Sequence, residues 1–127
     1  MGILDIFKSE GGEQEAKKMP WNPLTEVSAL DQIAEDSKSK LQVIFKHSTR
    51  CGISKMAMKQ FEAEFDYEGK IVAHYLDLLN YREVSNAIAE KFDVVHQSPQ
   101  IVVLKDGEAV HHASQDSISA KAIAAYI

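Results

Sequence analysis

An abrupt change of hydrophobic period between residues 41 and 65 is the feature that most constrains the fold of this chain. Residues 41–45 form a mostly apolar, partly β-branched run, which is typical of a buried strand. After Gly52, apolar side chains recur every three to four residues, which predicts one face of a helix. These side chains are Ile53, Met56, Ala57, Phe61 and Phe65. The sequence therefore predicts a strand that leads directly into a helix, and the other segments are interpreted around this joint.

The one cysteine of the chain, Cys51, lies at the joint. The unpaired amides and the positive dipole end of a helix N-terminus favour an anion, and the thiolate is the nucleophilic form of cysteine. Arg50 and Lys55 add positive charge nearby. The alternative is a buried, inert cysteine, but Thr49, Arg50 and Gly52 are not typical core residues. We therefore interpret Cys51 as a functional thiol.

Length and composition limit the other classes of function. The 127 residues, with 45% hydrophobic side chains, are typical of one globular domain. A net charge of -5 disfavours nucleic acid and anionic membranes as partners. No apolar run approaches the length of a membrane span, and the N-terminus does not resemble a signal peptide. A single cysteine excludes an internal disulfide and fits a reducing compartment, so we expect a cytoplasmic protein.

The remaining segments predict further alternation of helices and strands. We expect residues 1–20 to be a peripheral N-terminal segment and residues 21–127 to be the domain. Strands are predicted at 21–25, 71–76, 100–104 and 108–113. The last two are joined by the hairpin signal Asp106–Gly107. The predicted end of the helix after Cys51 is Gly69. The predicted N-caps of the other helices are Ser28, Asn80, and either Asp116 or Ser117.

This element order, β-α-β-α-β-α-β-β-α, predicts an α/β fold. We expect strands separated by helices to be parallel and the closing hairpin to be antiparallel. The result is a mixed central sheet with helices on both faces.

A cysteine at a strand-to-helix turn, followed later by Ser-Pro before a strand, resembles the thioredoxin fold. The usual C-x-x-C is replaced here by Cys-Gly-Ile-Ser at 51–54. Together with residues 47–54, the segment His-Gln-Ser-Pro-Gln-Ile-Val-Val-Leu-Lys-Asp-Gly at 96–107 resembles the monothiol bacilliredoxin family. The resemblance covers roughly residues 20–127. The family motif is often Thr-Cys-Pro-Ile-Ser, whereas this chain has Arg50 and Gly52 on either side of the cysteine.

This resemblance implies an activity, namely the removal of bacillithiol from S-bacillithiolated proteins. Those client proteins and bacillithiol itself, as the thiol co-substrate, are then the expected partners. Cys51 is expected to be the nucleophile, and the second thiol must come from outside the chain. Gly52, Ile53 and Ser54 are expected to stabilise the thiol. Arg50, Ser98 and Pro99 are expected to bind the substrate or thiol, with Pro99 resembling the cis-proline of the fold.

Two other classes of function remain open. Cys-Gly-Ile-Ser differs by one residue from the Cys-Gly-Phe-Ser of monothiol glutaredoxins, which bind a [2Fe–2S] cluster between two chains. That family's Gly-Gly pair is absent here, since Ala113-Ser114-Gln115 occupies the region. A non-catalytic adaptor that keeps the fold is the second alternative. No metal site within one chain is expected, because the five histidines lack ligand spacing and His111 and His112 point to opposite faces of a strand.

Overall fold

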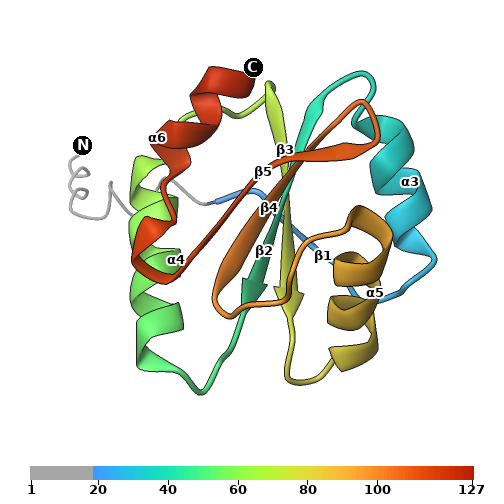
Figure 1. The fold of residues 1–127 in the computed structure, drawn as a ribbon. Helices are drawn as coiled ribbons and strands as arrows, with labels where there is room; N and C mark the ends of the chain where they lie inside the picture. The colour runs from blue at the N-terminus through green and yellow to red at the C-terminus, as the bar shows by residue number, and fades with distance from the viewer. Residues whose placement is uncertain (1–18) are drawn as a thin grey trace, which may run out of the picture.

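The computed structural model describes residues 19–127, which form a sheet with helices on both sides (Figure 1). The strands are β1 (Trp21–Pro23), β2 (Leu41–His47), β3 (Ile71–Asp77), β4 (Gln100–Lys105) and β5 (Glu108–Ser114). The helices are α3 (Ala29–Asp36), α4 (Gly52–Glu64), α5 (Arg82–Phe92) and α6 (Ala120–Ile123). Two short 3₁₀ turns, η1 (Gln115–Ser117) and η2 (Ala124–Tyr126), flank α6.

The five strands form one mixed sheet in the order β1-β3-β2-β4-β5. Strands β1 and β2 are parallel to β3, whereas β4 is antiparallel to both of its neighbours, β2 and β5. Strand β2 is central, and all seven of its residues are buried. A residue placed on β2 is therefore removed from water whichever face it points to.

The direction of β4 corrects one prediction from the sequence. We expected β4 to be parallel because a helix separates it from β3, but it is antiparallel to β2, which is itself parallel to β3. Helix α5 ends at Phe92, and residues 93–99 then lead the chain back to the end of the sheet where β3 finished. Strand β4 therefore starts at that end and runs the opposite way. The predicted mixed sheet with helices on both faces is confirmed.

The two faces of the sheet have separate hydrophobic cores. On one face, α3 and α5 cover β2, β3 and β4 through residues such as Leu30, Ile88 and Ile44. On the other face, α4 and α6 cover the same strands through residues such as Phe61, Ile123 and Phe45. Figure 1 shows these two helix pairs on opposite sides of the strands. Consecutive residues of β2 consequently contact different helix layers.

The hairpin signal is confirmed, whereas several predicted helix ends are wrong. Asp106 and Gly107 have φ values of 55° and 81°, as a two-residue turn of this kind requires. Helix α4 ends at Glu64, not at Gly69, because the buried Phe65 is already extended (φ −71°, ψ 123°). Helix α5 begins after Tyr81 with no side-chain cap, so Asn80 is not its cap.

The last helix is shorter than predicted and starts later. It spans only Ala120–Ile123, and the Ser119 hydroxyl accepts a hydrogen bond from the Ala122 amide at 3.4 Å. Asp116 and Ser117, the predicted caps, lie in η1 instead. At the start of α3, Ser28 occupies the predicted N-cap position, but its side chain does not cap the helix.

Residues 1–18 of the predicted N-terminal segment lie outside the described part of the chain, so the domain boundary at residue 20 stays a prediction. Between residues 19 and 127, no helix combines the length and hydrophobicity that crossing a membrane requires.

Candidate functional site

Cys51 occupies the N-cap position of α4, directly after the turn that follows β2. Its backbone is extended (φ −109°, ψ 123°), and its side chain is half-buried. The Cys51 amide donates to the Ser48 carbonyl at 3.2 Å, and the Cys51 carbonyl accepts the first helical bond from the Lys55 amide at 3.1 Å. Within the described residues, no side chain caps α4, and its first turn contains no acidic residue. The positive end of the helix is therefore left available to a thiolate.

Ser54 joins the first turn of α4 to the end of β2. Its side chain is fully buried, and its hydroxyl accepts from the Ser48 amide at 3.0 Å. The same oxygen lies 2.7 Å from Nδ1 of His47. Burial is the main cause that lowers the pKa of His47, which favours the neutral ring.

We call this arrangement of His47, Ser48 and Ser54 the serine clasp. Its geometry bears on the thiol-stabilising role expected for Ser54. The Ser54 oxygen is engaged by the His47 ring and the Ser48 amide, and no hydrogen bond to the Cys51 sulfur occurs among the described residues. What the clasp does hold is the turn between β2 and α4 that carries Cys51. A direct contact between Ser54 and the thiol stays a prediction.

The other residues expected around the thiol are on the surface. Arg50, Gly52 and Ile53 are all exposed. Apart from the two neighbouring residues and the backbone of α4 itself, no heavy atom lies within 4 Å of the position that a Cβ on Gly52 would occupy. The space beside Cys51 on that side is open. Ile53 and Met56 were expected on the packed face of α4, but they are 59% and 73% exposed.

The Pro99 loop, residues 93–99, forms the other part of the predicted site. The Ser98–Pro99 peptide bond is cis, as the resemblance implied. Because Lys46 pairs with Gln100 in the antiparallel ladder, Pro99 lies at the end of β2 from which the Cys51 turn departs. The Pro99 carbonyl accepts from the Gln115 amide at 3.1 Å. Among the described residues, the Ser98 backbone groups have no hydrogen-bond partner, so they are available to an extended ligand.

A buried lysine lies behind this loop. Lys46 is 0% exposed, and its Nζ lies 3.3 Å from His96 Nδ1 and 3.5 Å from the Ser85 carbonyl. The Ser85 hydroxyl also lies 3.2 Å from His96 Nδ1. Burial lowers the pKa of Lys46 to about 8. Burial, followed by the charges of Lys46 and Arg82, lowers the pKa of His96.

We call Lys46, Ser85 and His96 the lysine cluster. The Lys46 ammonium and the Ser85 hydroxyl lie within hydrogen-bond distance of the same ring nitrogen, Nδ1 of His96. Neither the contact of His47 with Ser54 nor the burial of Lys46 was predicted from the sequence. The available signal was the position of both residues at the end of a mostly apolar strand.

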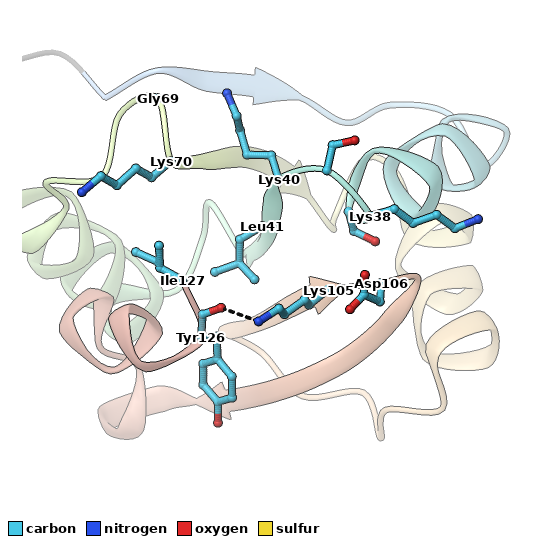
Figure 2. Close-up of a pocket in the computed structure, with 11 residues that line it drawn as sticks. Lys38, Lys40, Leu41, Gly69, Lys70, Lys105, Asp106, Tyr126 and Ile127 are labelled. Carbon is cyan, nitrogen blue, oxygen red and sulfur yellow. Dashed lines mark hydrogen bonds between the residues drawn. The ribbon is translucent and has the colours of Figure 1, made fainter.

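A separate hollow lies at the other end of β2 and is not part of this site. It has a volume of about 300 Å³, and its rim includes Lys38, Lys40 and Lys70, while Lys105 points inward and donates to the Tyr126 carbonyl at 3.1 Å (Figure 2). Leu41, the first residue of β2, lies in its wall. The length of β2 separates it from the Cys51 turn by roughly 20 Å.

No cluster of three or more His, Cys, Asp or Glu side chains suitable for a metal ion occurs within residues 19–127. A cluster bound between two chains would use a different set of ligands, so this observation describes the single chain alone.

Comparisons with known proteins agree with this geometry. A structure described as a candidate oxidoreductase with a thioredoxin fold is 30% identical to this chain and covers 84% of it and 92% of its own length, with a TM-score of 0.72. Thioredoxin from Malassezia sympodialis is 18% identical, with coverages of 84% and 87% and a TM-score of 0.64. Oxidised thioredoxin from Plasmodium falciparum is 24% identical, with coverages of 83% and 96% and a TM-score of 0.63.

The two thioredoxins are similar to this chain in fold. At the level of sequence, residues 22–123 match the family model described as Monothiol bacilliredoxin BrxC. The match includes the Cys51 turn, the serine clasp and the Pro99 loop. Together with the oxidoreductase-like neighbour, it supports a thiol redox role. The chain has the thioredoxin fold and belongs to the monothiol bacilliredoxin family.

Proposed function

We propose that this protein removes bacillithiol from S-bacillithiolated client proteins in the cytoplasm, with Cys51 as the nucleophile. The observation that carries the proposal is the position of the one thiol of the chain at the uncapped N-terminus of α4, beside open space at Gly52. A thiolate is favoured there, and a bulky disulfide can approach it.

The reaction is a sequence of two thiol–disulfide exchanges without net oxidation. The Cys51 thiolate attacks the bacillithiol sulfur of the client disulfide, a new S–S bond forms to Cys51, and the client leaves as a thiolate. The chain contains no second cysteine, so Cys51 remains joined to bacillithiol. A second bacillithiol thiolate then attacks that sulfur, and Cys51 is released together with bacillithiol disulfide. Reduction of this disulfide requires a separate enzyme.

The surroundings of Cys51 suggest roles for the other residues. The exposed guanidinium of Arg50 has no ion-pair partner among residues 19–127 and is free to attract the carboxylates of bacillithiol. The Ser98 backbone can pair with the client segment or with the peptide-like part of the thiol. The serine clasp keeps the Cys51 turn in place throughout the exchange.

Intact-mass analysis of the reduced protein mixed with an S-bacillithiolated client tests the proposal. We expect the client to lose one bacillithiol and the protein to gain one on Cys51, and addition of free bacillithiol should restore the reduced protein. The Cys51→Ser variant is the control, and it should leave the client modified. The proposal fails if the wild-type protein leaves the client modified or if Cys51→Ser keeps full turnover. Iron and sulfide in the purified protein would favour a cluster carrier instead.

A further inference from the structure

Two large apolar side chains next to Cys51 are more exposed than the packing of α4 explains. Ile53 and Met56 are 59% and 73% exposed, although Phe61 of the same helix is buried. Both belong to the lining of a groove of about 350 Å³, to which α4 also contributes Ala57 and Gln60. Apolar side chains that are exposed together in a groove are typical of an interaction site, whereas single exposed apolar residues are common on any protein surface.

The opposite wall of the groove is continuous with the Pro99 loop. It consists of Gln115, Asp116 and Ile118, which follow β5. The Gln115 amide donates to the Pro99 carbonyl at 3.1 Å, so this wall is tied to the loop at the end of β2. The groove thus begins within one helical turn of Cys51 and continues along α4, opposite residues 115–118.

The chemistry of the lining fits the client polypeptide better than it fits bacillithiol. Ile53, Met56, Ala57 and Ile118 offer an apolar surface, the two glutamines are neutral, and Asp116 is the one charged residue that residues 19–127 contribute to the lining. From this part of the chain, the carboxylates of bacillithiol meet a negative charge and no cation in the groove. An apolar side chain of a polypeptide matches this surface, whose nearest lining residue, Ile53, is two residues from Cys51.

The geometry of α4 sets the spacing between the client cysteine and the groove. Met56 follows Cys51 by five residues, which corresponds to about 7–8 Å along the helix at 1.5 Å per residue. An extended client segment covers that distance in roughly two to three residues at 3.3 Å each. We propose that the groove binds an apolar client side chain two to four residues from the bacillithiolated cysteine and thereby selects clients. This inference rests on the proposed function and adds its client specificity.

The test uses pairs of S-bacillithiolated peptides that differ only by Leu or Ser at positions two to four on either side of the cysteine. We expect the wild-type protein to favour one leucine peptide by about tenfold in kcat/KM, mainly through KM, since partial burial of a leucine is worth about one such factor. Met56→Gln, which keeps the length of the side chain, should remove most of this preference, whereas Met56→Leu should keep it. Val110→Gln is the matched control, because Val110 is exposed on β5 outside the groove.

Two further measurements separate the failure of this inference from that of the proposed function. A small mixed disulfide of bacillithiol and cysteamine does not reach the groove, so wild type and all Met56 variants should reduce it equally. In the unreactive Cys51→Ser protein, the thiol-free leucine peptide should shift the amide NMR signals of Met56, Gln60 and Gln115, and the serine peptide should not. If these shifts occur but no bacillithiol is ever removed, the groove is a polypeptide site and the proposed function is wrong. Equal shifts with both peptides, equal turnover of both, or a preference that survives Met56→Gln overturns the inference.

Discussion

Removing the hydroxyl of Ser54 should destabilise the protein far more than a serine-to-alanine change on the surface does. The hydroxyl is fully buried, accepts from the Ser48 amide at 3.0 Å and forms a hydrogen bond with His47 Nδ1 at 2.7 Å. Each hydrogen bond contributes about 1 kcal/mol, and the Ser48 amide left without a partner adds about 1 kcal/mol because water reaches this half-buried position. The expected loss for Ser54→Ala is therefore about 2 to 3 kcal/mol in the free energy of unfolding.

Urea denaturation at pH 7 measures this loss, and Ser39→Ala is the matched control. Ser39 is exposed in the turn between α3 and β2, and its side chain has no hydrogen-bond partner among the described residues, so its loss should stay within about 0.5 kcal/mol. A double-mutant cycle with His47→Phe should give a coupling energy of about 1 kcal/mol between His47 and Ser54. A loss for Ser54→Ala as small as that for Ser39→Ala, or a coupling near zero, would refute the clasp.

Two other predictions concern the pH dependence of stability. Burial lowers the pKa of His74 to about 4, and its Nε2 bonds to Gln42 at 2.7 Å; the unfolded chain therefore binds the proton first as pH falls. Stability should decrease by about 2 to 3 kcal/mol between pH 6.5 and 4, and urea denaturation of His74→Gln should show a smaller decrease. The pKa of Lys46 is lowered to about 8, so the unfolded chain binds more protons between pH 8 and 10.5. The free energy of unfolding of the wild type should rise across that range relative to that of Lys46→Met. At pH 7, Lys46→Met should be at least as stable as the wild type. A less stable variant would show that the contacts of the lysine cluster compensate the cost of burying the charge.

Local sequence signals were sufficient for the strands and for the joint at Cys51. The apolar run at 41–45 and the Asp106–Gly107 turn each require one conformation, and the structure has both. The direction of β4 was not predictable from element order alone, since residues 93–99 return the chain along the whole length of α5. The rule that two strands joined by a helix run parallel assumes a short connection after the helix, and the seven residues of the Pro99 loop do not meet that condition.

The helix ends depend on tertiary contacts that no local pattern contains. Helix α4 stops because Phe65 turns into the core and packs edge-on against Tyr67. The Glu64 carboxylate then accepts from the Ala120 amide at 3.2 Å, which helps to fix where α6 starts. Ile53 satisfied the helical period but lies exposed, whereas its polar neighbour Ser54 is the buried residue of the first turn of α4. An apolar residue at a core position without a core to cover it is a signal of function that the structure alone reveals.

Two consecutive residues of β2 connect the two parts of the candidate site. Lys46 points to the face covered by α5 and contacts His96 of the Pro99 loop, whereas His47 points to the face covered by α4 and contacts Ser54 of the Cys51 helix. Both are polar groups in a strand that is buried throughout, so each costs desolvation that an apolar residue would avoid. Their contacts link the central strand to the Cys51 turn and to the Pro99 loop. The position of Cys51 relative to Pro99 thus depends on buried polar contacts on opposite faces of one strand, and these are the contacts that the Lys46 and His47 substitutions remove one at a time.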